Sequence, residues 1–358
     1  MTEKFAEAKR NSTEIEETNK TAETARYDFS EIMAALQKSQ YPLLTGHVSP
    51  DADAVGSALA LALALERLGK EPAVVFKDDI PDYLKFMPGA EKIIKPDQLD
   101  EKRDLLVMVD CASPKRIGKM WSEPWFAKIP CIAVDHHETN DGFACRSLVD
   151  AKAAANSQIV YYLVQALGVA LDKPLATCLF AGISGDTGGF RFSNTNRETM
   201  EIGGRLMDLG VDTQEVRIQL FECKSMKDMA MIGVGLENMR QSADGKLVWT
   251  SISLKEKTEH GAAESNCENI SDYTMYPVGV KVGIFFQEMP NGMVKMSMRC
   301  RDGYNVAKVA KAFDGGGHVV AAGCRTEGEL RTVMAAVLAE AEKMIAEAEA
   351  EQNQKAVK

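Results

Sequence analysis

The residues best suited to chemistry in this sequence are aspartates and histidines that gather in four short segments. The segments read HVSPDADAVGS, VMVDC, AVDHH and GISGDTGGFRFSNT, and their candidates are His47, Asp51, Asp53, Asp110, Asp135, His136, His137 and Asp186. The chain has only five histidines, and three of them fall in these segments beside aspartates. A ligand set of carboxylates and imidazoles suits Mn²⁺ or a similar transition metal better than Ca²⁺.

A centre of two divalent metals needs several carboxylates, one of which bridges ions about 3.5–4 Å apart. Asp110 stands alone at the end of an apolar run, so it is the candidate for the bridge. A single aspartate in such a place is more often a helix cap or a turn residue. The joint occurrence of the four segments nevertheless favours a metal site. Asp135 is expected to orient a histidine, because metal-bound histidines usually donate their other ring nitrogen.

Alternating strand and helix patterns are predicted to position these segments. Strands are expected at 41–46, 73–77, 104–110 and 129–135, and helices at 54–68, 156–167, 174–184 and 194–210. Such alternation predicts parallel strands with crossover helices, and unbroken apolar runs predict strands buried on both faces. Since the carboxyl ends of parallel strands share one crevice, the four segments are predicted to converge there.

The second half of the chain has a different pattern. Residues 211–230 are mixed and charged and are predicted to form a linker, followed by strands at 246–254, 278–289 and 293–301 and helices at 306–313 and 327–349. The turn PNG at 290–292 predicts a hairpin. The predicted fold class is α/β. An N-terminal parallel-sheet domain with helices on both faces (27–210) precedes a smaller C-terminal α/β domain (231–350), between an acidic leader (1–26) and a polar tail (351–358).

Composition excludes several classes of protein. The net charge of −10 disfavours binding of long duplex nucleic acid, which needs an extended basic face, but permits a short fragment in a local pocket. Eight cysteines without a CxxC pair argue against a zinc ribbon or a disulfide framework and for a reducing compartment. With no secretory signal and no apolar run of about 20 residues, we expect a cytoplasmic protein without a membrane partner. A homodimer is left open.

The four segments resemble, in order, the motifs of the DHH phosphoesterase superfamily, and Asp135, His136 and His137 match its name-giving triplet. The resemblance implies that His47, Asp51 and Asp110 hold one metal and that Asp53, Asp110, His136 and Asp186 hold the other. It also implies that His137 faces the substrate phosphate or leaving oxygen, so that Asp110 and His137 are the catalytic residues. Ala52 replaces the usual glycine of the family, which is compatible with a turn residue of negative φ.

Residues 296–325, MSMRCRDGYNVAKVAKAFDGGGHVVAAGCR, are similar to the DHHA1 domain with its S-x-R-S, GGGGH and A-A-G elements. Arginine forks onto phosphate, and glycines let backbone amides approach an anion or a base. Taken alone, GGGH is more often a plain loop. The substrate-binding residues implied by the resemblance are His137, Arg299, Gly315, Gly316, Gly317 and His318.

Two residues depart from the DHHA1 pattern. Asp314 replaces the first glycine of GGGGH, and Cys300 replaces the second serine of S-x-R-S. A carboxylate near a phosphate pocket would weaken or redirect anion binding. Their effect on substrate choice is left open.

The joined DHH and DHHA1 patterns resemble the nano-RNase group. This implies a hydrolase that uses two Mn²⁺ ions, with Mg²⁺ or Co²⁺ as alternatives. Its implied substrates are short RNA or DNA, linear dinucleotides such as pApA, and 3′-phosphoadenosine 5′-phosphate. The alternatives are a cyclic-dinucleotide phosphodiesterase, a pyrophosphatase or polyphosphatase, and a nucleotide-binding regulator with a degenerate site. The GGGH element disfavours the pyrophosphatase, and the complete ligand set disfavours the regulator. The cleavage polarity stays open.

Overall fold

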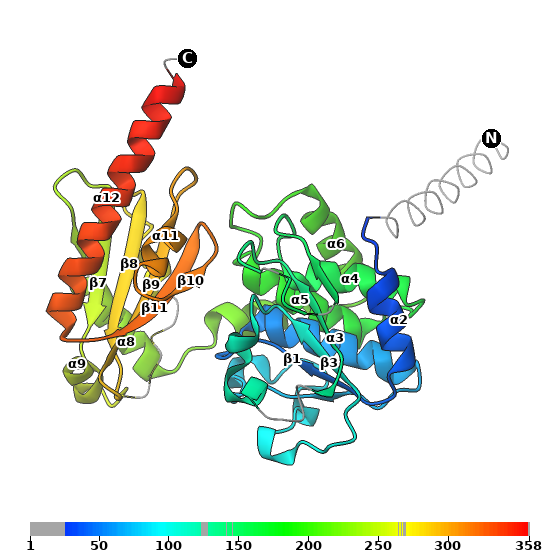
Figure 1. Ribbon diagram of the computed structural model, residues 1–358. Coiled ribbons are helices and arrows are strands. Elements are labelled where there is room, and N and C mark those ends of the chain that lie inside the picture. The colour runs from blue at the N-terminus through cyan, green and yellow to red at the C-terminus, as the bar shows by residue number, and fades with distance from the viewer. Residues whose placement is uncertain are drawn as a thin grey trace, which may run out of the picture. The chain divides into compact units, whose positions relative to one another are not determined.

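The computed structural model describes residues 26–122, 128–140, 142–144, 146–263, 265, 267 and 270–356 (Figure 1). The chain divides into two compact units, Met1–Cys223 and Lys224–Lys358. The predicted leader lies outside the described residues except for Arg26, which pairs with Asp150 and Glu198. Within the described residues, every helix is too short or too polar to cross a bilayer.

The first unit is built on a five-stranded sheet of order β2-β1-β3-β4-β5. Every strand pair is parallel, which confirms the predicted sheet. The strands are β1 (Pro42–Thr45), β2 (Ala73–Val74), β3 (Leu105–Val109), β4 (Cys131–Asp135) and β5 (Arg146–Val149). β1 and β3 are buried along their whole length. β2 is shorter than predicted. The edge strand β5 was not predicted, because its polar and half-exposed residues do not form an apolar run.

The α-helices of this unit pack on one face of the sheet. They are α2 (Ser30–Lys38), α3 (Ala52–Arg67), α4 (Asn156–Ala166), α5 (Lys173–Asp186), α6 (Arg197–Asp208) and the short α7 (Thr213–Arg217). Leu44, Val107 and Val134 face their shared core. The opposite face, with Leu43 and Leu106, is covered by segments that contain 3₁₀ turns. These turns are η3 (Pro96–Gln98) and η4 (Pro114–Ser122). The turns η1 (Asp82–Leu84) and η2 (Ala90–Lys92) lie on the helix side, because Leu84 and Ala90 belong to the core shared with the α-helices.

In the described part of the chain, the helices predicted on both faces are α-helices on one face and short 3₁₀ helices on the other. The connections that cover the second face carry helix-breaking residues, such as Pro96 and Gly118. Gly118 adopts a positive φ. These connections consequently form short turns in place of crossover α-helices.

Helices α3 and α5 meet in close backbone contact. A Cβ atom added to Gly56 would lie 2.5 Å from the carbonyl oxygen of Cys178, and one added to Gly185 would lie 2.7 Å from Cβ of Ala52. A Cβ on Gly182 would lie 2.8 Å from Oδ1 of Asp53. No side chain fits at these positions without a shift. The three glycines thus bring the beginning of α3 against the end of α5.

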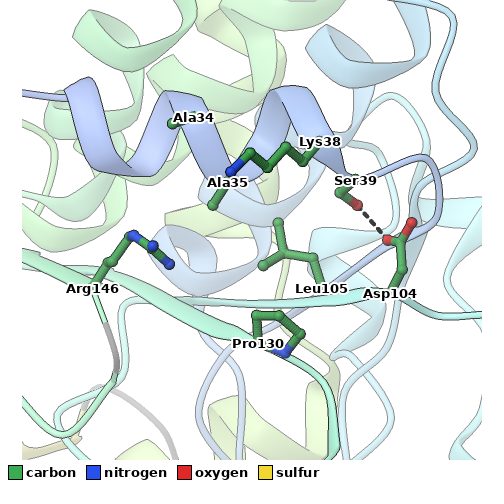
Figure 2. Close-up of a pocket in the computed structure, with 8 residues that line it drawn as sticks. All are labelled: Ala34, Ala35, Lys38, Ser39, Asp104, Leu105, Pro130 and Arg146. Carbon is green, nitrogen blue, oxygen red and sulfur yellow. Dashed lines mark hydrogen bonds between the residues drawn. The ribbon is translucent and has the colours of Figure 1, made fainter.

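A pocket lies under α2 at the amino ends of the strands (Figure 2). Its wall includes Asp104, whose carboxylate accepts hydrogen bonds from the hydroxyl of Ser39 and from the amide of Gln40, at 2.8 Å. Leu105, another lining residue, begins β3. The pocket is therefore at the opposite end of β3 from Asp110.

The second unit contains a six-stranded sheet of order β10-β11-β9-β8-β7-β6. Only β7 and β8 are parallel neighbours among its described strands. The strands are β6 (Arg240–Gln241), β7 (Leu247–Ile252), β8 (Val282–Glu288), β9 (Met293–Cys300), β10 (Gly316–Gly317) and β11 (Ala321–Glu327). The helices are α8 (Met226–Glu237), α9 (Leu254–Glu259), α10 (Ile270–Tyr273), α11 (Val306–Lys311) and α12 (Leu330–Ala356). The predicted α/β class is confirmed in this unit as well.

Two segments near the predicted boundaries are helical. The stretch predicted as a linker, 211–230, contains α7 (Thr213–Arg217), a π-helical turn (Ile218–Glu222) and the start of α8. The predicted polar tail, 351–358, continues α12 as far as Ala356. Its residues 351–356, EQNQKA, contain no glycine or proline and include good helix formers, so polarity alone does not end the helix.

Candidate metal centre

The predicted metal ligands of the first unit lie together at the carboxyl end of its sheet. His47 follows β1, Asp110 follows β3, and His136 follows β4. Asp51 and Asp53 lie at the start of α3. Asp186 is the last residue of α5, so a helix end and not a strand end brings it to the site.

His47, Asp51 and Asp110 form the first group. The Nδ1 atom of His47 lies 2.9 Å from the carbonyl oxygen of Val48, which directs Nε2 toward the carboxylates. Nε2 lies 3.5 Å from Oδ2 of Asp51 and 3.5 Å from Oδ2 of Asp110. Asp51 caps α3, because its Oδ1 accepts hydrogen bonds from the amides of Asp53 and Ala54 at 3.0 Å. The cap leaves its other oxygen facing the histidine.

His136 is the centre of the second group. Its Nδ1 lies 3.2 Å from the carbonyl oxygen of Ala153. Its Nε2 lies 3.2 Å from Oδ2 of Asp186, 3.3 Å from Oδ1 of Asp110 and 3.8 Å from Oδ2 of Asp53. A backbone acceptor at one ring nitrogen is the usual way to aim the other nitrogen at a metal.

Asp110 belongs to both groups. One carboxylate oxygen faces His47 and the other faces His136. The residue has a positive φ of 51°, which aspartate tolerates better than most residues, and its amide donates to the carbonyl oxygen of Val134 at 3.0 Å. Oδ1 is buried and makes no hydrogen bond within the described part of the chain. A buried carboxylate oxygen without a hydrogen bond lowers the stability of the fold unless a cation lies beside it.

The pKa shifts of the clustered aspartates and histidines also fit a site for cations. Burial raises the pKa of Asp53 well above its usual range, and the carboxylates of Asp110 and Asp186 raise it further. Burial lowers the pKa of His136, but the carboxylates of Asp110 and Asp186 outweigh burial and hold this pKa well above its usual range. Repulsion among carboxylates that share a site is what raises such a pKa. The donor set therefore fits divalent ions.

Backbone amides fix Asp53, which is fully buried. The amide of Asn156 donates to Oδ2 at 2.5 Å, and the amide of Ser157 donates to Oδ1 at 2.8 Å. Both amides lie at the beginning of α4, where helix donors are unpaired and the helix dipole favours an anion. These donors were not identified from the sequence. The polar pair Asn156–Ser157 at the start of a predicted helix was the available signal.

Asp135 holds His137. Its Oδ1 lies 2.8 Å from Nδ1 of His137 and accepts the amide of His136 at 2.9 Å, while Oδ2 accepts Nδ2 of Asn140 at 2.7 Å. Asp135 is fully buried, so these donors fix it firmly. Asn140 was not identified from the sequence.

Arg299 lies on β9 in the second unit. Its Nε is 3.2 Å from Oδ1 of Asp272, and its Nη1 donates to the carbonyl oxygen of Met298 at 3.2 Å. Across the strands it pairs with Ala321 of β11. Asp272 is a partner that the sequence analysis missed, because the two residues are far apart in the chain.

The glycine element has a structural role as well. Gly316 and Gly317 form β10 and pair with Gly323 and Ala322 of β11. Gly317 has a φ of 137°, and a Cβ there would lie 2.6 Å from the carbonyl oxygen of Ala321. A Cβ on Gly316, in contrast, would meet no atom of the described chain within 4 Å. Packing therefore requires glycine at 317 and leaves room at 316.

The departures from the family patterns have local explanations. Ala52 is the first residue of α3, and its φ is negative, as expected. Asp314 adopts the left-handed conformation that a glycine would adopt, with a φ of 56°. The buried thiol of Cys300 lies 3.3 Å from the carbonyl oxygen of Val319 and 3.4 Å from that of Tyr304. The Cys300 thiol thus makes its hydrogen bonds inside the second unit.

Two family models match the chain. Residues 43–183 match the N-terminal domain of the DHH family, and residues 244–348 match the DHHA1 domain. The bifunctional oligoribonuclease and PAP phosphatase NrnA of Thermus thermophilus is 33% identical, over 84% of this chain and 87% of its own length. The chain belongs to the DHH family. With the family's His/Asp clusters, it is a metal-dependent phosphoesterase.

Other members of the DHH family cover most of the chain as well. The NrnA of Bacillus subtilis is 27% identical over 78% of this chain and 88% of its own length. The solved structure of an exopolyphosphatase-related protein from Bacteroides fragilis has a TM-score of 0.78 and 26% identity, over 89% of this chain and 94% of its own. Both DHH and DHHA1 parts are therefore shared with relatives of similar extent.

Proposed function

We propose that this DHH phosphoesterase degrades short oligonucleotides or linear dinucleotides such as pApA to mononucleotides, and that it also dephosphorylates 3′-phosphoadenosine 5′-phosphate. The similarity to the Thermus NrnA, which extends over both domains, carries this proposal. NrnA proteins are named for oligoribonuclease and PAP phosphatase activities. The acidic chain suits a short substrate better than a long duplex.

The cofactor of the proposed reaction is a pair of Mn²⁺ ions, with Mg²⁺ and Co²⁺ as alternatives. His47, Asp51 and Asp110 would hold one ion, and Asp53, Asp110, His136 and Asp186 would hold the other. When bound, divalent ions activate water and offset the charge that develops on phosphorus. The position of Asp110 supports its assignment as the bridge, because one carboxylate oxygen faces His47 and the other faces His136.

The remaining residues bind and orient the substrate in this proposal. Asp135 fixes one ring nitrogen of His137, so the opposite nitrogen is directed away from it, toward a substrate phosphate or leaving oxygen. Arg299 binds a phosphate remote from the scissile bond, held in place by Asp272. The remaining substrate contacts are assigned to Gly315, Gly316, Gly317 and His318.

The Bacteroides fragilis structure supports a second candidate, hydrolysis of polyphosphate, because that protein is described as related to exopolyphosphatases. A cyclic-dinucleotide phosphodiesterase is a third. A cleavage panel with Mn²⁺ separates the three, using RNA of 2 to 24 nucleotides, pApA, cyclic di-AMP, 3′-phosphoadenosine 5′-phosphate and tripolyphosphate. We expect the highest kcat/KM on the shortest RNA and on pApA. Faster hydrolysis of tripolyphosphate or cyclic di-AMP would contradict the proposal, and undiminished cleavage of the 24-mer would indicate an open exonuclease groove.

A pair of variants tests nucleotide recognition by the second unit. Arg299→Ala and His318→Ala should each lower kcat/KM on pApA by about 10- to 150-fold, the range for a charge-assisted hydrogen bond. Bis(p-nitrophenyl) phosphate carries no second phosphate or base and should be hydrolysed at the wild-type rate. Equal losses on both substrates would assign these residues to the fold instead.

The cytoplasmic location and the oligomeric state stay part of the proposal. All seven cysteines in the described residues are free thiols, in keeping with a reducing compartment. Sedimentation at several concentrations would determine whether the chain dimerises.

A further inference from the structure

An exposed aromatic pair has no role in the metal centre. Tyr273 ends α10, and Tyr276 follows it three residues later. Their rings form an edge-to-face contact, with centroids 5.4 Å apart and an interplanar angle of 61°. Tyr276 is 63% exposed, whereas Tyr273 packs partly against the core of the second unit. The partly buried ring of Tyr273 thus supports the ring of Tyr276, which faces solvent.

Several contacts place the end of α10 beside Arg299. Asp272, the residue before Tyr273, lies 3.2 Å from Nε of Arg299. Gly283 pairs with Arg299 in the sheet, and a Cβ on Gly283 would lie 2.9 Å from Sδ of Met275. On the other side, Nη2 of Arg301 donates to the carbonyl oxygen of Met275 at 2.9 Å. The segment that leads into Tyr276 is therefore fixed against β8 and β9, next to the arginine.

We propose that Tyr276, braced by Tyr273, stacks on a base of the nucleotide whose phosphate Arg299 binds. This inference rests on the proposed function and extends its binding site to the base. Proteins that bind single-stranded nucleic acid combine a cation for the backbone with an exposed aromatic ring for the base. A ring gives no such contact to pyrophosphate or polyphosphate. Tyr276 therefore favours nucleotides over these phosphate chains, and stacking tolerates any base.

Kinetics on modified dinucleotides test the stacking. Tyr276→Ala should lower kcat/KM on pApA by about 5- to 150-fold, and Tyr276→Phe should keep the wild-type value, since stacking needs the ring and not the hydroxyl. Two further substrates each replace one base of pApA by hydrogen. For one of these two substrates, removal of the base should lower kcat/KM of the wild type by the same factor as Tyr276→Ala lowers kcat/KM on pApA. The same base removal should not lower kcat/KM of the Tyr276→Ala variant any further. Independent, multiplicative losses for both substrates would overturn the inference.

Val278→Ala is the matched control, because this side chain is 98% exposed in the same loop and carries no ring. It should behave as wild type, and a loss equal to that of Tyr276→Ala would mean that the loop, not the ring, matters. Failure of the wild type to cleave pApA would contradict the proposed function alone. The stacking would then be judged by quenching of 2-aminopurine riboside 5′-monophosphate fluorescence, which the wild type must produce and Tyr276→Ala must abolish.

Discussion

The Nδ1 atom of His137 lies 2.8 Å from Oδ1 of the fully buried Asp135, which fixes the orientation of the imidazole. His137→Ala should lower kcat by about 10²- to 10⁴-fold, the range for a positioned acid or base. Its metal content should stay at the wild-type level, because His136 lies among the other ligands. Metal counting by inductively coupled plasma spectrometry checks this. Loss of metal from His137→Ala but not from His136→Ala would mean that the two roles are reversed.

Asp110 contacts both groups of ligands, so its substitution should be the most damaging of the aspartate changes. Asp110→Ala should lose at least one metal and lower kcat by several orders of magnitude, because both ions depend on it. Asp51→Ala removes a ligand from one group only and should retain more metal. Chelation of the wild type with EDTA should abolish turnover, with Mn²⁺ restoring it. Near-normal activity of Asp110→Ala with full metal content would refute the bridge.

Because α3 and α5 are in close contact, replacement of a glycine between them by alanine should lower the free energy of unfolding markedly. Gly56→Ala would place its Cβ 2.5 Å from the carbonyl oxygen of Cys178. Overpacking of this kind costs about 1–3 kcal/mol of unfolding free energy, so the melting temperature should fall by several degrees. Metal affinity should weaken as well, because the helices carry Asp53 and Asp186.

Gly204→Ala is the control for that prediction. Gly204 lies on α6, and a Cβ there would meet no atom of the described chain within 4 Å. Replacement of an exposed helical glycine by alanine stabilises by about 0.5–1 kcal/mol. The two variants should thus shift the melting temperature in opposite directions. Equal shifts in calorimetry would disprove the close-contact explanation.

A substitution at Gly316 tests substrate binding by the glycine element without disturbing its packing. Gly316→Ala should fold normally, because the space around this position is open. If its backbone amide approaches a substrate anion, the added methyl group should raise KM for pApA severalfold and leave bis(p-nitrophenyl) phosphate hydrolysis unchanged. Gly233→Ala on α8, which also faces open space, should leave both substrates unaffected. An unchanged KM for pApA in Gly316→Ala would remove Gly316 from the binding site.

Apolar runs and residue spacing were enough to predict the parallel sheet. β1 and β3 are buried on both faces, so their sequences read as continuous apolar runs. β5 and β11 could not be predicted in the same way. Each lies near or at a sheet edge and mixes apolar residues with polar residues or glycine. The aspartates and histidines of the candidate metal centre were identifiable because three of the five histidines stand beside aspartates in segments that follow apolar runs.

The contacts that hold these ligands were harder to predict, since they join distant parts of the chain. Asn156 donates its amide to Asp53, and Asp272 lies against Arg299. Neither pair has a fixed spacing, so only the folded backbone identifies them. Asp186, in contrast, follows the helix predicted at 174–184 within two residues, and it ends α5 in the structure.

The glycine contact between α3 and α5 also leads us to expect a restriction on the ions that the proposed centre accepts. Gly56 lies against the main chain of α5, and the two helices carry Asp53 and Asp186. A larger ion would require the carboxylates to rotate or the helices to separate. Ca²⁺ takes longer oxygen bonds and more ligands than Mg²⁺ or the transition metals. We therefore expect the backbone packing of this helix pair to favour small divalent ions over Ca²⁺.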